Sequence, residues 1–271
     1  MNRPALYTLP SVRFKRKATL FSLVSILLVG TCIYLQFNPW MLVTEFHYVT
    51  ELIGSMLPPN FEVLWSGKGI AFSILETISM AFLGTLFGGS IAVVLAFLAA
   101  SNTMPLRFVR VLVRLVLSLQ RVIPGLVIIL IFVIAVGLGA FAGMLTLVFG
   151  TIGTFGQLFT EIIENTENAP SEAIYSVGAS RMQVIRYAIL PQVFPSFIAN
   201  FLYSFDINMR AAIGLGIFGG GGIGFELFLS MRVLHYRDAL ALIFFTILLI
   251  IFVEKISDAL RRRILGDGRL K

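Results

Sequence analysis

Two oppositely charged residues, Asp206 and Arg210, lie four positions apart within a long apolar stretch of the sequence. On a helix this spacing places both side chains on one face. A charge inside an apolar span is energetically costly and therefore marks a candidate functional site. Because a guanidinium can bind the oxygens of an anion bidentately, Arg210 and the neighbouring Asn208 could line a path or gate for an anion. The alternative is an Asp206–Arg210 pair that neutralises itself for packing.

Glu76 and Arg121 are further charges close to the ends of apolar runs. A bare carboxylate at Glu76 would repel an anion, so we expect it to be paired with Arg210 or with a backbone amide. Arg121 precedes a break at Pro124-Gly125 and is either a contact for a departing anion or an anchor in the membrane interface. The anchor is the favoured interpretation.

The sequence carries no motif typical of catalysis or of cofactor binding. The stretch from Gly214 to Gly224 contains G-x-G-x-x-G, but the βαβ context of a nucleotide fingerprint is missing, and G-x-x-x-x-G-K-[ST] does not occur. The glycines predict instead a broken helix or re-entrant turn. His47, His235 and Cys32 stand alone, so we predict no catalytic residue, no metal site and no cofactor bound by this chain.

The elements that must position these residues are membrane helices. The 271 residues are 58% hydrophobic and 13% charged, with a mean hydropathy of +0.92, whereas soluble domains contain about a quarter charged residues. A span takes roughly 20 apolar residues. The pattern predicts an all-α polytopic membrane protein with six transmembrane helices, at about 18–37, 70–100, 108–138, 141–163, 192–217 and 238–255.

The net charge of +7 comes from basic residues that gather at the ends of the apolar runs, which indicates membrane topology rather than nucleic-acid binding. Basic groups before the first run and after the last place both termini in the cytoplasm. The first run is long for a signal peptide and lacks a clear cleavage site, so we expect a retained anchor helix. Residues 107–121 form a basic amphipathic stretch, expected to lie along the cytoplasmic interface.

The longest polar segment between spans, 161–191, predicts a helix, a turn and a second helix exposed to the cytosol. Asn168 is expected to cap the first helix, with Pro170 and Glu172 in its first turn. Gly178 would end that helix, and Leu190-Pro191 would close the segment before the fifth span. Such a protrusion could fit a groove on another protein.

Glu172-Ala173, Gly178 and Leu190-Pro191 reproduce the spacing of the EAA loop of ABC importer permeases, with Ile174 and Ala188 as apolar departures from it. The segment therefore resembles that loop, which forms a coupling helix against the ATPase subunit. The resemblance implies that the contact is made by the residues of the loop: Glu172, Ala173, Gly178, Ala179, Leu190 and Pro191. The alternative is an ordinary capped helix at the membrane interface.

Further motifs narrow the resemblance to the phosphonate-type permeases, the PhnE family. They are Glu76-Thr77, Arg121 to Pro124, Gly137 to Gly143, Gly178 to Arg181, Leu190 to Gln192, Asp206 to Arg210 and Gly219 to Gly224. The similarity runs from about residue 70 to 260. The chain departs from the family at Asp206, where glutamate is more frequent, and at Gly220, where alanine is expected.

This resemblance implies a permease subunit that carries a phosphonate, phosphite or phosphate by alternating access. Its implied partners are an ABC ATPase dimer that binds ATP and Mg, a second permease copy or paralogue, an external binding protein and the lipids of a bacterial inner membrane. The expected organisation is a tail, anchor helix and external segment at 1–69, the permease domain at 70–260 and a basic cytoplasmic tail at 261–271.

Two other classes remain as alternatives. A secondary transporter or channel working without an ATPase would rely on Glu76, Asp206 and Arg210 as intramembrane ion sites. An intramembrane enzyme would need a nucleophile and base that the sequence does not offer. Co-isolation with an ATPase separates the permease from the secondary transporter.

Overall fold

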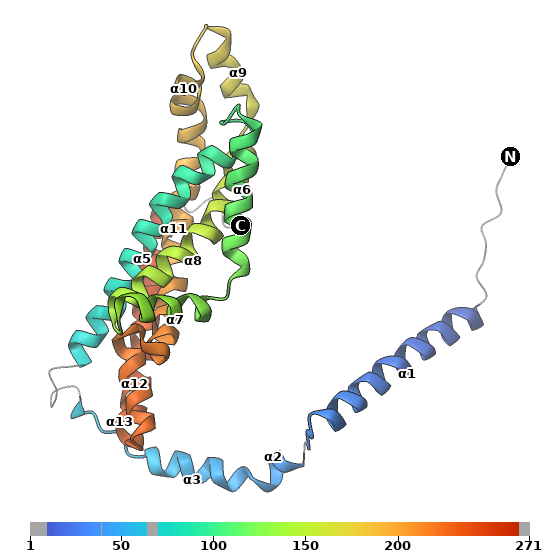
Figure 1. Cartoon of the computed structure of the whole chain (residues 1–271), viewed down its shortest axis with the longest axis vertical. Coiled ribbons are helices and arrows are strands. Elements are labelled where there is room, and N and C mark those ends of the chain that lie inside the picture. Colours follow the sequence, from blue (N-terminus) through green and yellow to red (C-terminus); the bar gives the residue numbers. More distant parts are fainter. Residues whose placement is uncertain (1–9, 39, 64–69, 266–271) are drawn as a thin grey trace. The chain divides into compact units, whose positions relative to one another are not determined.

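The computed structural model describes residues 10–38, 40–63 and 70–265, and every regular element in these ranges is a helix (Figure 1). The chain divides into two units, Met1–Ser55 and Met56–Lys271. The first contains α1 (Pro10–Tyr34), α2 (Met41–Thr44) and all but the last residue of α3 (Phe46–Met56). Residues 1–9 of the predicted N-terminal tail and residues 266–271 of the predicted C-terminal tail lie outside the described residues.

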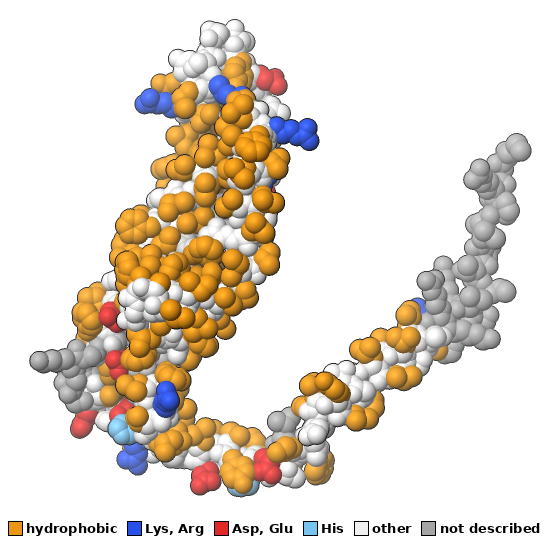
Figure 2. All heavy atoms as spheres, viewed as in Figure 1, with side chains coloured by type: hydrophobic (Ala, Val, Ile, Leu, Met, Phe, Trp, Pro, Cys, Tyr) orange, Lys and Arg blue, Asp and Glu red, His pale blue; other side chains and the backbone are white. Residues whose placement is uncertain are grey.

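The second unit is a bundle of long helices with shorter ones at its ends and side. Its elements in order are α5 (Ile70–Ala99), α6 (Arg107–Val122), α7 (Gly125–Val136), α8 (Ala140–Glu164), α9 (Asn168–Ser176), α10 (Arg181–Val184), the π-helical turn η1 (Ile185–Ile189), α11 (Leu190–Leu215), the π-helical turn η2 (Gly216–Gly220), α12 (Gly222–Arg232) and α13 (Tyr236–Leu265). Hydrophobic side chains cover the visible middle of this unit, and charged side chains gather towards its ends (Figure 2).

Among the described residues, five helical stretches are long and apolar enough to cross a membrane, and α6 with α7 makes a sixth if the bent pair counts as one span. These six correspond to the six predicted spans. The pair bends by 91° at Pro124, where the sequence predicted a break. Ile123 is extended because a residue before proline is driven out of the helical region, and proline itself offers no N–H for the helix.

Small residues bring α5 and α8 into close contact. A Cβ added at Gly84 would lie 2.6 Å from Leu147 Cβ, and one at Gly88 would lie 2.7 Å from Thr151 Cβ. Small residues serve this purpose in membrane helices, where close backbone approach replaces the hydrophobic effect as a source of attraction. The glycines of α5 therefore have a packing role.

The helix after α11 is broken by glycines, as predicted. Gly219, Gly221 and Gly222 have φ values of +92°, +73° and +71°, which side chains other than glycine rarely adopt. Gly139 N–H, at the start of α8, donates to Gly219 O at 2.8 Å. The irregular backbone is thus held by the neighbouring helix and is not left unsatisfied.

Two details of the predicted 161–191 segment are wrong. Asn168 is the first residue of α9 and not its cap; Glu167 stands at the cap position without a side-chain hydrogen bond. Leu190-Pro191 does not end the second helix, because α10 continues through η1 into α11. Leu190 N–H donates to Ile185 O, five residues back, and this wide turn places Pro191 in the first turn of α11, where a missing donor is tolerated.

Candidate functional site

The hairpin formed by α9, the turn at Gly178 and α10 projects at one end of the second unit (Figure 1). No residue of α9 is buried, and Gly178 has a φ of +83° that allows the chain to reverse. Glu172, Ala173 and Gly178 are exposed, as are Leu190 and Pro191 at the base of the hairpin, whereas Ala179 is half-buried. The tip also exposes the large apolar side chains of Val177 and Met182. An exposed carboxylate among exposed apolar groups is suited to contact with another protein.

The base of this hairpin is tied to the long helices. Arg181 Nη2 donates to Asn102 O at 3.4 Å, and Asn102 Nδ2 donates to Ile163 O at 2.6 Å, which joins α10 to the turn directly after α5 and to the end of α8. Glu167 N–H donates to Gln192 Oε1 at 3.0 Å, which joins the start of α9 to α11. Hydrogen bonds therefore connect the base of the hairpin with the ends of three long helices.

Glu76 lies on α5 and accepts a hydrogen bond from the first residue of α12. Its Oε2 is 3.0 Å from Gly222 N, and the neighbouring Thr77 Oγ1 accepts from Ile223 N at 2.9 Å. Both acceptors satisfy the otherwise free N–H groups at a helix start, where negative charge is also favoured. Of the two partners expected for Glu76, the structure contains the backbone amide.

Arg210 faces α13. Its Nη2 lies 3.1 Å from Asp206 Oδ2 and 3.0 Å from Glu254 Oε2, and about half of its side chain is exposed. The predicted pairing with Asp206 is present. Glu254 was missed, because no sequence spacing links a residue on α13 to one on α11; its position near the end of an apolar run was the available signal.

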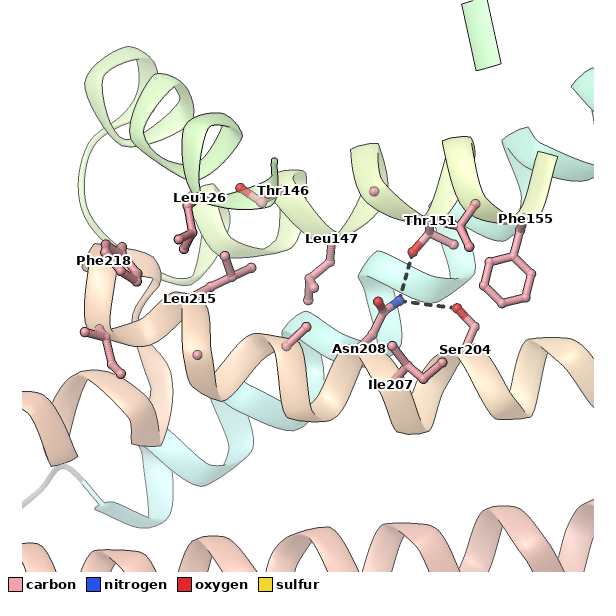
Figure 3. A pocket seen from close by; sticks show the side chains of 16 residues that line it. Leu126, Thr146, Leu147, Thr151, Phe155, Ser204, Ile207, Asn208, Leu215 and Phe218 are labelled. Carbon is pink, nitrogen blue, oxygen red and sulfur yellow. Dashed lines mark hydrogen bonds between the residues drawn. The ribbon is translucent and has the colours of Figure 1, made fainter. Parts of the chain in front are cut away.

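Asn208 points into the contact between α8 and α11, towards Thr151 and Ser204 (Figure 3). Its Nδ2 donates to Thr85 Oγ1 on α5 at 2.8 Å and to Thr151 Oγ1 on α8 at 2.9 Å, and it lies 3.5 Å from Ser204 Oγ on its own helix. Asn208 and Arg210, which the sequence placed on one path, thus lie on different faces of α11.

A cavity of about 530 Å³, here named the Asn208 cavity, lies beside this network and between α7, α8, α11 and η2 (Figure 3). Its wall is largely apolar. The polar side chains in the wall are Thr146, Thr151, Thr154, Ser204 and Asn208. Sequence reasoning found Asn208 but missed the hydroxyl groups, since threonine and serine are common in membrane helices and give no individual signal.

Arg121 lies at the end of α6, apart from the cavity. Its Nη1 donates to Gln157 Oε1 on α8 at 2.8 Å, and its side chain is exposed. The structure therefore brings together Asp206 and Arg210 but leaves Arg121, Glu76 and Asn208 at three separate places. In the described ranges no group of three or more His, Cys, Asp or Glu side chains is placed to hold a metal ion.

The helical bundle with its exposed hairpin is that of a membrane-embedded transport subunit. Residues 92–266 match the family model described as "Binding-protein-dependent transport system inner membrane component". The chain belongs to this family. It is therefore a permease component of an ABC importer in the inner membrane, and ATP hydrolysis is the work of a partner subunit.

Permeases named for phosphite and phosphate transport are similar to this chain over most of its length. The phosphite transport system permease protein PtxC of Stutzerimonas stutzeri is 37% identical over 215 residues, which cover 79% of this chain and 77% of the relative. The phosphate-import permease protein PhnE of Mycolicibacterium smegmatis is 37% identical over 235 residues, 87% of this chain but only 44% of the relative. The predicted resemblance to phosphonate-type permeases is confirmed.

Solved structures support the same fold. The inward-facing MetNI methionine ABC transporter gives a TM-score of 0.64 at 16% identity, covering 76% of this chain and 99% of that one. A bacterial alginate ABC transporter in complex with an alginate pentasaccharide-bound periplasmic protein gives a TM-score of 0.65 at 16% identity, covering 93% and 98%. The predicted all-α architecture of an ABC importer permease is confirmed.

Proposed function

We propose that this chain, paired with a second copy or a paralogue, forms the path of an ATP-driven importer for a phosphorus oxyanion. The observation that carries the proposal is the 37% identity to a phosphite permease over 79% of this chain. The substrate class is a phosphonate, phosphite or phosphate. That relative is named for phosphite transport and the Mycolicibacterium smegmatis relative for phosphate import. An external binding protein delivers the anion.

The exposed hairpin is the docking element for the ATPase dimer, which binds ATP and Mg. Glu172, Ala173 and Gly178 are exposed at its surface, and its base is bonded to α5, α8 and α11. Closure of the ATPase dimer would displace the hairpin and shift these helices together, which is how alternating access would be driven. The hydrogen bonds at the base of the hairpin support this transfer of motion from the ATPase to the helices.

The topology follows from the hairpin. With α9 and α10 in the cytoplasm, six spans return both termini to the cytoplasmic side, as the basic flanks favour. Residues 70–260 then form the permease domain, 1–69 supply the tail, anchor helix and external segment, and 261–271 form a basic tail. Asn208 and its cavity line the transport path. The charged residues have structural roles: the Asp206–Arg210 pair and Glu254 hold α11 against α13. Glu76 holds α12 against α5, and Arg121 anchors α6 at the membrane interface.

Reconstitution tests this function. The chain would be expressed with an ABC ATPase and a binding protein encoded beside it, purified as a complex and placed in proteoliposomes. We expect uptake of labelled phosphate, phosphite or methylphosphonate that needs internal ATP and persists when ionophores collapse ion gradients. Accumulation by this chain alone, driven by an ion gradient, would show a secondary transporter instead.

A further inference from the structure

The orientation of the Asn208 amide is set by Thr85. Thr85 Oγ1 donates its only proton to Ala81 O at 2.7 Å, so towards Asn208 it can only accept. The amide nitrogen must therefore face Thr85, and its second proton goes to Thr151 Oγ1 at 2.9 Å. The network has a fixed direction, in which Asn208 donates and the hydroxyl groups accept.

This direction leaves two hydroxyl protons without an acceptor. Other buried threonines of α8 donate to the carbonyl four residues back, Thr146 to Ala142 O at 2.9 Å and Thr160 to Gly156 O at 2.6 Å. Among the described residues, neither Thr151 nor Ser204 donates a hydrogen bond, although their exposed fractions are only 3% and 2%. A buried donor without an acceptor is unfavourable. Both residues line the Asn208 cavity, where a ligand could accept from them (Figure 3).

We propose that the hydroxyl groups of Thr151 and Ser204 form a charge-neutral binding site for the phosphorus oxyanion within the Asn208 cavity. This inference rests on the proposed function and deepens it by naming a place where the substrate binds. Asn208 is a positioning residue: its amide fixes the Thr151 hydroxyl as a donor. Its Oδ1, which accepts no hydrogen bond from any described residue, can accept from a protonated oxygen of the anion.

A neutral site suits a transported anion. Among the described residues that line the cavity there is no Lys, Arg, Asp or Glu, so an anion there meets hydrogen-bond donors but no fixed charge of these residues. Passage requires binding strong enough for entry and weak enough for release. Arg210 would hold an anion more firmly, but its guanidinium is already paired with Asp206 and Glu254 beside α13.

The test uses the complete importer in proteoliposomes, with inorganic phosphate, phosphite and methylphosphonate as probes at concentrations below saturation. Thr151→Val and Ser204→Ala each remove one donor, and Thr151→Ser keeps it. Thr160→Val is the matched control, because Thr160 lies on the same helix, does not line the cavity and donates its proton to Gly156 O. Loss of one hydrogen bond to a charged ligand corresponds to about a tenfold change, so we expect uptake to fall about tenfold in the first two variants and to stay within about twofold in the others.

Structural damage is separated from loss of binding by measuring the amount of assembled complex and its ATP hydrolysis. Ser204→Ala is the cleaner variant, because the 3.5 Å contact with Asn208 is long and the two short bonds remain. Normal uptake by Ser204→Ala and by the double variant with Thr151→Val overturns this site while the proposed function stands. A wild-type importer that hydrolyses ATP yet carries none of the three probes overturns the proposed substrate class, and this site with it.

Discussion

Asn208 and Arg210 lie two positions apart on α11, and with 3.6 residues per turn their side chains point to opposite sides of the helix. One side joins three helices through neutral hydrogen bonds. On the other side, Arg210 pairs with Asp206 of the same helix and with Glu254 of α13. Polarity inside the membrane therefore serves two purposes here. The neutral side borders a cavity, and on the charged side the positive and negative side chains neutralise one another.

Neutralising Arg210 tests this division at the residue scale. Arg210→Gln leaves Asp206 and Glu254 without their cation, and breaking a buried ion pair costs about 3–5 kcal/mol. Because the Arg210 side chain is about half exposed, we discount this to about 1–2 kcal/mol and expect a lower midpoint of thermal unfolding in detergent together with weaker uptake.

The triple variant Arg210→Gln, Asp206→Asn and Glu254→Gln removes all three charges and should restore both thermal stability and uptake. If thermal stability returns but uptake does not, Arg210 contacts the substrate. The structural role of its ion pairs would then not account for the loss of uptake.

At the scale of elements, the close approach of α5 to α8 depends on glycine. A Cβ at Gly88 would lie 2.8 Å from Val148 O, which is backbone and cannot move aside alone. Gly88→Ala should therefore separate the helices and lower the unfolding midpoint by several degrees. Gly150→Ala is the control, since no atom outside the nearby backbone of its own helix lies within 4 Å of its added Cβ. Alanine favours a helix by about 1 kcal/mol over glycine, so this variant should be at least as stable as the wild type.

The attachment of α12 to α5 gives a second prediction for the elements. Glu76→Leu removes the acceptor of Gly222 N–H, and losing a charged partner at a helix start costs about 1 kcal/mol. Amide hydrogen exchange at 219–226 should accelerate about fivefold by mass spectrometry. Glu51→Gln, on α3, should leave that exchange unchanged. Equal protection in Glu76→Leu and wild type would show that the glycine packing alone holds α12.

Breaks in the helices were predictable from sequence because they follow from local backbone chemistry. Pro124 disfavours helix at Ile123, and the glycines near Gly219 permit positive φ values. The partners of Asn208 and Arg210 were not predictable, because Thr85 lies 123 positions and Glu254 44 positions away in the chain. Such pairs depend on how helices rotate against one another. The prediction that Pro191 ends the helix was wrong, because a π-helical turn precedes it. Pro191 therefore lies in the first turn of α11, where a backbone N–H is not needed.

At the scale of the whole molecule, the hairpin is the element through which a bound ATPase could move the membrane helices. It is exposed at its tip and bonded at its base to α5, α8 and α11, whose other surfaces border the Asn208 network. The same helices thus connect the docking element with the candidate binding site. Any rotation of α8 against α11 would change the distance between Thr151 and Asn208, and so the geometry of the cavity wall.

Reversing the charge at the hairpin tests this connection. Glu172→Lys changes an exposed side chain, so the chain should fold normally, while docking to the ATPase should weaken. A tenfold loss of affinity corresponds to about 1.4 kcal/mol, well within the range of a single interface residue. We expect about tenfold less co-purified ATPase and a matching loss of ATP-driven uptake. Glu51→Lys makes the same charge change on α3, which the proposed topology places outside, and should leave both measurements unchanged. Full uptake by Glu172→Lys, with the ATPase still bound, would mean that the carboxylate has no part in coupling.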